Sequence, residues 1–378
     1  MLSGRLEAIW NQVSFIAELK VKFMRKTGYV LYIFAAIIIV CGGCGAVDVG
    51  QQGSANGRRV LSAQIQKEIS PHALDIAAWE INNLLTPGPG DDAKGPGVAG
   101  FSNLPENISS VLIAENITVF PQVRVKLVEP PLLLVISPRD RIAYYGRILL
   151  TPDLTGDVMV QIEGKVDALD LSSLVVRLGG FGAAYPAIVS PDMAPAHIVN
   201  AVVEEWAHQY LAFKPLGFLY LVDSLGWRQD PGVIVMNETL AGMIAREIGG
   251  KVYERYYSNT VSKLNGPDPG AFDFSREMRE TRLKVDGLLA TGKIEEAERY
   301  MQDRLIDFNR QGYKIRKLNQ AYFAFHGIYG QDPGAVSPVY RDMLKLRKNY
   351  TDLAGFVDKI SGMASYADLE KAVSGPAD

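Results

Sequence analysis

The chain has 378 residues, of which 48% are apolar and 21% are charged, and its formal net charge is −3. This composition is that of an ordinary globular protein, and the length leaves room for one large domain or two smaller ones. The near-neutral balance argues against an electrostatic footprint for DNA or RNA, so we expect no nucleic-acid partner. The two cysteines, Cys41 and Cys44, both lie near the N-terminus, so the rest of the chain has no disulfide framework and no thiolate metal site.

The N-terminal residues have the pattern of a membrane anchor. Residues 1–27 form a tail with more basic than acidic side chains, and residues 28–47 carry no charge. A run of about 20 apolar residues is long enough to span a bilayer. We therefore predict a basic cytoplasmic tail at 1–27 and a transmembrane signal-anchor helix at 28–48. The basic flank predicts a cytoplasmic N-terminus and an extracytoplasmic main domain in the cell membrane.

A lipid anchor is the alternative for the same segment. A start at Met24 would give a short basic region, an apolar core and small residues before Cys44, which resembles a lipoprotein signal. Cys41, three places earlier, fits that pattern poorly. A redox pair of Cys41 and Cys44 is disfavoured at the edge of a membrane span.

The next segments predict helices first and strands afterwards. Residues 49–57 are a polar linker, and 58–85 have a helical pattern that is interrupted near Pro71. Residues 86–100 are rich in Gly, Pro and Asp and predict a long loop.

Between residues 108 and 180 the pattern changes to strands. The candidate strands share short apolar or alternating runs between turn residues, and they are 119–128, 132–136, 142–150, 158–162 and 173–180. A short helix is predicted at 162–171. Gly179 and Gly180 do not form a phosphate-binding loop, because the Lys and Ser/Thr of such a loop are missing.

The following helix carries the residues of chemical interest. Pro195 suits a first helical turn, and Glu204 and His208 are four residues apart, so they share one helix face. Glu205 lies roughly 100° further round the axis. A second polar pair, Asn237 and Glu238, precedes an apolar run at 239–245. This run predicts another helix, which we expect to end at 249–250.

The arrangement is close to the His-Glu-x-x-His zinc motif. In that motif two His on one helix face bind the metal and the Glu is the general base, and a carboxylate from a later helix is the usual third ligand. Here Glu205 occupies the position of the general base. His208 occupies the position of the second ligand, and Glu238 that of the third ligand. The first ligand position holds Glu204 instead of His.

These residues resemble a known family. The runs at 204–211, 215–217 and 236–241 are similar to the zincin-like aminopeptidases of bacteria, and more closely to membrane-anchored proteins of the same build. The resemblance extends from about residue 75 to the C-terminus. It implies an α+β zincin-like fold, with a small sheet and a mostly helical remainder, over an extracytoplasmic domain at 58–378.

The same resemblance implies a site. It makes His208 and Glu238 metal ligands and Glu205 the catalytic base, and it puts the edge strand 173–180 beside the site helix, where an extended peptide could add as a further strand. We therefore include further residues as candidate cleft residues: Gly179, Gly180, Tyr185 and His326. His326 could donate a hydrogen bond to the transition state, but a packing role is favoured for it, and Tyr185 is a further candidate donor.

Two positions depart from the family pattern. Glu204 stands where a His ligand is expected, and Gly242 stands where an Asp that orients a ligand imidazole is expected. A site of Glu204, His208 and Glu238 would suit zinc, with a tilt towards harder metals such as Mn²⁺. Two hypotheses follow: a membrane-anchored, zinc-dependent peptidase of the aminopeptidase type, or a catalytically inactive scaffold without metal that binds extracytoplasmic peptides or envelope proteins.

The C-terminal third is predicted to be helical. Residues 252–264, 272–290 and 293–325 have helical patterns, and 339–372 form one or two closing helices. No 34-residue period supports a helical repeat array.

Overall fold

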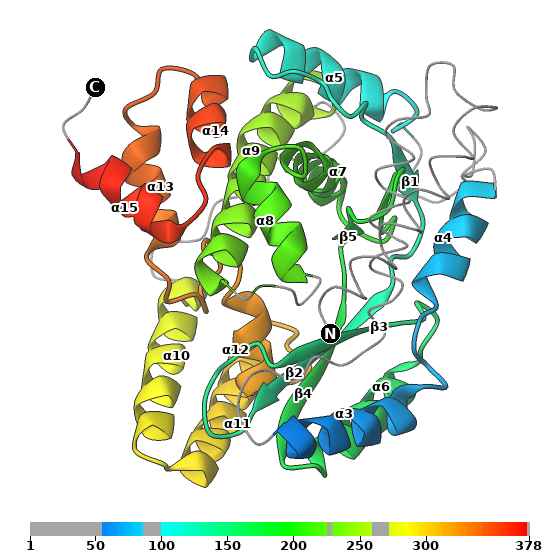
Figure 1. Cartoon of the computed structure of the whole chain (residues 1–378), viewed down its shortest axis with the longest axis vertical. Helices are drawn as coiled ribbons and strands as arrows, with labels where there is room; N and C mark the ends of the chain where they lie inside the picture. The colour runs from blue at the N-terminus through cyan, green and yellow to red at the C-terminus, as the bar shows by residue number, and fades with distance from the viewer. Residues whose placement is uncertain (1–54, 86–99, 225–227, 229, 259–271, 376–378) are drawn as a thin grey trace.

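The computed structural model describes residues 55–85, 100–224, 228, 230–258 and 272–375. The predicted tail, membrane segment and lipid-anchor cysteine lie outside these residues, as do most of the linker and of the loop at 86–100. The described chain is a mixed α+β structure with small sheets and many helices, as predicted (Figure 1). Within the described ranges, none of the helices combines the length and apolar character that crossing a bilayer requires.

A three-stranded antiparallel sheet forms one layer of the structure. Its central strand β2 (Leu132–Pro138) is flanked by β3 (Gly146–Leu150) and β4 (Leu171–Arg177). Leu134 of β2 lies opposite Ile148 on one side and Val175 on the other. All of β2 except Pro138 is buried, which explains its continuous apolar run.

Helices cover both faces of this sheet. On one face α6 (Gly156–Asp167) packs beside β4, with α3 (Ala55–Ile69) against α6. On the other face α12 (Gln320–His326) packs against β2 and β4. The helix α4 (Ile76–Leu85) follows α3 after the break that was predicted near Pro71.

The predicted strand at 158–162 is wrong, because these residues belong to α6. Thr155 caps this helix: its side chain accepts a hydrogen bond from the Val158 N–H. The periodic apolar residues Met159, Ile162 and Val166 are buried on one face of α6, which a short apolar run alone does not distinguish from a strand.

A second small sheet lies beside the long helices. It pairs β1 (Val125–Leu127) in parallel with β6 (Ala187–Val189), and β5 (Gly180–Phe181) in antiparallel with β6. The helix α7 (Pro195–Leu211) packs against β6 and β5. The expectation that 173–180 forms the strand beside α7 is therefore wrong: residues up to Arg177 form β4 in the first sheet, and the strands that pack against this helix are β6 and the short β5.

The core of the molecule is the packing of α7 against α9 (Pro231–Tyr256). Asp230 caps α9, since its side chain accepts from the N–H groups of Gly232 and Val233. The helix continues through Gly249 and beyond, so the predicted end at 249–250 is wrong. A Cβ atom on Gly249 would lie 2.1 Å from Asn200 Oδ1 and 3.2 Å from Asn200 Cα, so this glycine lets α7 and α9 approach closely.

Further helices enclose α9 in the main hydrophobic core. They are α5 (Leu104–Ala114), α8 (Pro215–Ser224), α13 (Val339–Arg347), α14 (Leu353–Ser361) and α15 (Tyr366–Ser374). The last three occupy the region that was expected to form one or two closing helices. Trp206 of α7 is buried in this core and donates to the carbonyl of Pro121 at 2.8 Å.

The remaining helices form a hairpin next to the first sheet. These are α10 (Phe274–Ala290) and α11 (Ile294–Arg310), which share a separate apolar cluster. The single helix predicted at 293–325 is wrong, because α11 ends at Arg310 and Gly312 adopts a positive φ of 92°. The chain becomes helical again only at α12, which Asn319 caps by accepting from the Tyr322 N–H.

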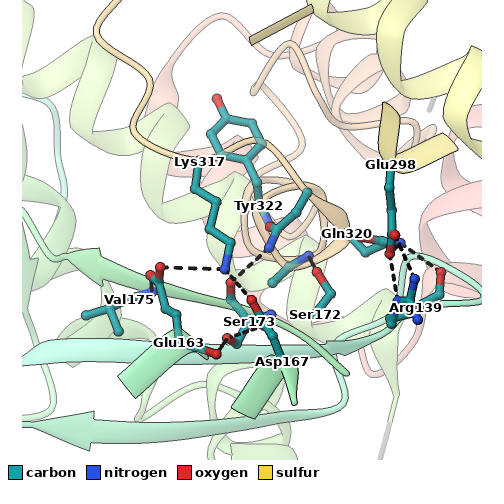
Figure 2. A network of polar contacts seen from close by, with 12 residues as sticks. Arg139, Glu163, Asp167, Ser172, Ser173, Val175, Glu298, Lys317, Gln320 and Tyr322 are labelled. Atoms are coloured by element: carbon teal, nitrogen blue, oxygen red, sulfur yellow. Dashed lines mark hydrogen bonds and ion pairs between the residues drawn. The ribbon is translucent and has the colours of Figure 1, made fainter. Parts of the chain in front are cut away.

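A polar network holds this helical segment on the sheet (Figure 2). Arg139, at the end of β2, donates two hydrogen bonds to Glu298 of α11 at 2.8 and 2.7 Å, and Gln320 donates to the Arg139 carbonyl at 2.8 Å. Lys317 lies 2.7 Å from Asp167 of α6. These contacts fix the start of α12 relative to β2 and α6.

The close approach at Gly249 gives a testable prediction. Gly249→Ala should lower the free energy of unfolding by about 1–3 kcal/mol, because the added methyl group overlaps Asn200. The matched control is Gly250→Ala, whose Cβ meets nothing within 4 Å and which should raise stability by roughly 0.5–1 kcal/mol. Urea denaturation of both variants measures the difference, and equal effects would contradict this account of Gly249.

Candidate metal centre

Three side chains from the two central helices meet at one point. Glu204 and His208 of α7 and Glu238 of α9 each offer one ligand atom, and these atoms lie within 4.8 Å of one another. Glu204 and His208 share a face because they are four residues apart on α7. Glu238 reaches them because α9 packs along α7. The residues form a group that could hold a metal ion.

A hydrogen bond orients the imidazole of His208. Its Nδ1 lies 2.9 Å from Oδ1 of Asn237, which precedes Glu238 on α9 and is 1% exposed. The amide oxygen is an acceptor, so Nδ1 carries the proton. The Nε2 atom then points to Glu238, whose Oε2 is 3.4 Å away. This is the arrangement of a metal-binding His, whose second nitrogen is held by a hydrogen bond from outside the ligand set.

Tyr220 of α8 supports the same group from another side. Its hydroxyl donates to Glu238 Oε1 at 2.7 Å, and its ring stacks on His208 with the centroids 5.9 Å apart. The contact leaves Oε2 of Glu238 for His208 or for a metal. Sequence reasoning missed Tyr220: it is one of 17 tyrosines, and its apolar helix gave no pattern that marked it.

Glu205 packs against the edge strand β5. A Cβ on Gly180 would lie 2.2 Å from Glu205 Oε1, and one on Gly182 would lie 2.6 Å from Oε2, so both positions need glycine. The Gly182 N–H also donates to this carboxyl. Gly180 therefore borders Glu205, whereas a Cβ on Gly179 would lie 3.3 Å from Sδ of Met193.

The four ionisable groups strongly influence one another. Burial lowers the pKa of His208, but the carboxylates of Glu238, Glu205 and Glu204 outweigh it and raise that pKa to about 10. Burial raises the pKa of Glu238, but His208 and the Tyr220 hydroxyl bring it below its ordinary value. Without a metal, His208 and Glu238 are therefore an ion pair.

The other two carboxyls hold their protons more tightly. Burial raises the pKa of Glu205 to about 8. The charge of His208 lowers this pKa, and the charges of Glu204 and Glu238 raise it further. Burial also raises the pKa of Glu204, which the charges of His208 and Arg246 partly offset. A carboxyl with a pKa near neutrality has the property that general acid–base chemistry needs.

The space beside Gly242 is filled by another residue. A Cβ on Gly242 would lie 1.8 Å from Nε2 of Gln331, so the Gln331 side chain rests on α9 one turn after Glu238. The neighbouring Gly330 N–H donates to Thr239 Oγ1 at 3.1 Å. Gln331 thus occupies the space that a side chain at position 242 would need, a contact that the sequence did not reveal.

The same loop brings Tyr329 towards the site. Burial raises the pKa of the Tyr329 phenol well above its ordinary value, and the charges of Glu238, Glu204 and Glu205 raise it further. The phenol therefore stays protonated, remains a hydrogen-bond donor and is within the electrostatic influence of the three carboxyl groups. Sequence reasoning did not select it.

The two remaining candidate cleft residues have other partners. His326 Nδ1 lies 2.7 Å from Asp332 Oδ2, and the imidazole ring packs against Tyr322 with a centroid separation of 4.1 Å. Tyr185 is buried in a small apolar cluster, and its hydroxyl donates to the Gln122 carbonyl at 3.2 Å. Neither belongs to the group of Glu204, His208 and Glu238.

Searches against protein-family models, curated proteins and solved structures found no match to this chain. The geometry of the site is therefore the basis for assigning a function.

A buried carboxyl near Tyr185 gives a prediction for pH. Burial raises the pKa of Glu80 to about 7, although the Tyr185 N–H and Lys126 oppose the shift. The folded state then binds the proton more tightly than the unfolded state, so this stabilisation is complete below about pH 4.5 and is lost as the pH rises to about 7.

Glu80→Gln should remove this loss. Relative to the wild type, the variant should gain roughly 2 kcal/mol of stability between pH 4.5 and pH 8. Denaturant unfolding across this pH range measures the change, with the exposed Glu106→Gln as control. A constant difference between Glu80→Gln and wild type over the range would contradict the prediction.

Proposed function

We propose that this chain is a metal-dependent peptidase with a zincin-like fold. The observation that carries the proposal is the group of Glu204, His208 and Glu238 together with the hydrogen bond from His208 to Asn237. Their spacing along α7 and α9 follows the zinc-peptidase pattern in every position except the first ligand.

The donor set fits a divalent metal. Two carboxylates and one imidazole suit zinc, and the share of oxygen ligands also suits Mn²⁺. Asn237 and Tyr220 hold His208 and Glu238 in place, and a ligand set supported in this way needs little rearrangement. When bound, the metal would supply Lewis-acid polarisation of a peptide carbonyl and of the attacking water.

Glu205 is the residue that would move the proton. Its carboxylate would take a proton from the attacking water and then pass it to the amine that leaves. The strand β5 is an edge of its sheet and borders Glu205 through Gly180, so an extended peptide could pair with this edge and lie across the base. Tyr329 stays protonated and would be available as a donor in the same region.

A second function is favoured by one observation. In the described structure Glu238 and His208 form an ion pair at 3.4 Å, and Glu204 adds a further carboxylate where a neutral His would otherwise stand. A charge pair that satisfies itself can stabilise the helices without a metal. The alternative is therefore an inactive scaffold that binds extracytoplasmic peptides or envelope proteins along β5.

The cellular setting is part of the proposal. The apolar segment at 28–48 would anchor the chain in the cell membrane, with the peptidase domain outside the cytoplasm. Lipid attachment at Cys44 would give the same orientation.

Metal content tests the two functions directly. The full chain, purified in detergent and dialysed against zinc, should retain about one equivalent of metal by elemental analysis. Glu238→Ala should lose it, whereas the exposed Glu254→Ala on the same helix should not. Metal that is absent from the wild type but present in Glu204→His would overturn the peptidase and support the inactive scaffold.

Asn237 gives a finer prediction about the same group. Asn237→Ala removes the acceptor for His208 Nδ1 and should weaken zinc binding about 10–100-fold in a chelator competition. Asn237→Asp keeps an acceptor oxygen at this place and should bind zinc close to the wild-type level. An Asn237→Ala protein with unchanged zinc affinity would show that this hydrogen bond does not orient a ligand.

A further inference from the structure

An arginine from the first sheet lies at the edge of the candidate metal centre. Arg147 is on β3, opposite Val135 of β2, and is exposed. Side chains that lie opposite one another on neighbouring strands point to the same face. Val135 belongs to the apolar cluster on the α12 face, which also includes Phe325 and Tyr329. Arg147 therefore projects from the face of the sheet that looks towards the metal centre.

The surroundings of Arg147 connect it to that centre. The guanidinium donates to the carbonyl of Ser224, the last residue of α8, at 3.2 Å, and it is hydrogen-bonded to Tyr144. Its charge also lowers the pKa values of Glu238 and Tyr220. Contacts with β3 and with the end of α8 thus fix the group beside the ligand Glu238 and its partner Tyr220.

Charge and exposure suggest what this position could bind. Two exposed arginines act by their charge on the carboxyls of the candidate ligands: Arg246 of α9 on Glu204, and Arg147 of β3 on Glu238. A guanidinium matches the planar geometry of a carboxylate and binds it through charge-assisted hydrogen bonds. Ser224 lies one turn after Tyr220 on α8, so the guanidinium stands on the α8 side of the Glu238 carboxyl that Tyr220 holds.

We infer that Arg147 binds a carboxylate of the peptide substrate and thereby selects peptides that carry a negative charge just beyond the bond at the metal centre. This inference rests on the proposed function and adds the substrate class. The carboxylate has two sources, the C-terminus of a peptide or an Asp or Glu side chain. The first source would make the cleavage of the carboxypeptidase type, in contrast to the aminopeptidase resemblance of the motif.

Three peptides distinguish these cases: acetyl-trialanine with a free C-terminus, the same peptide as its C-terminal amide, and an amidated acetyl-Ala-Ala-Asp. Binding is measured by calorimetry on the full chain in detergent, in a Glu205→Gln background that prevents cleavage. We expect a carboxylate-bearing peptide to bind roughly tenfold or more tightly than the uncharged amide. Which of the two carboxylate peptides binds better identifies the source.

Variants then assign the preference to one residue. Arg147→Gln should abolish the preference and leave the metal content unchanged, and Arg147→Lys should retain part of it. Arg141→Gln is the matched control, because Arg141 lies at the turn between β2 and β3 and pairs with Asp140 at 2.8 Å. A preference that survives in Arg147→Gln, or equal or undetectable binding of all three peptides, overturns the inference.

The metal analysis of the same preparations separates the two proposals. A wild type that lacks metal but shows a preference dependent on Arg147 would overturn the peptidase and keep the carboxylate site. A wild type that holds metal but binds the three peptides equally would keep the metal centre and overturn the role of Arg147.

Discussion

The close packing of α7 against α9 is the constraint on which the rest of the structure depends. Gly249 lets the backbone of α9 approach Asn200 of α7, and the main hydrophobic core surrounds this contact. The approach brings Glu238 within reach of Glu204 and His208. A larger separation of the two helices would leave three polar side chains buried without one another, which is costly because a buried charge needs a partner.

The site is an example of buried charge that is balanced locally. His208 lies between Asn237 and Glu238, and Tyr220 gives Glu238 a second hydrogen bond. The same set of contacts serves an ion pair without metal and a ligand set with one, because both need a fixed imidazole and a fixed carboxylate. Glu204 adds a further carboxyl to this group, and measurements of metal decide between the two states.

The site also depends on residues outside the two helices that carry its motif. From the side of the sheet and α12, the charge of Arg147 of β3 acts on Glu238, and the loop that carries Tyr329 places Gln331 against Gly242 of α9. The network around Arg139 and Lys317 fixes α12 on that sheet, and the loop follows directly after α12. Stability of the sheet and architecture of the site are thus physically coupled.

The sequence by itself determined the α+β class, the buried strand at β2, the start of α7 at Pro195 and the shared face of Glu204 and His208. These features follow from local patterns: strand signals followed by helical ones, an unbroken apolar run, a proline at a helix start and a spacing of four residues. Only the tertiary structure decided that Gly249 sits inside a helix, that β5 and β6 rather than β4 pack against α7, and that Gln331 fills the space at Gly242. In each of these cases the deciding contact comes from an element that is distant in the sequence, so the local sequence pattern cannot predict it.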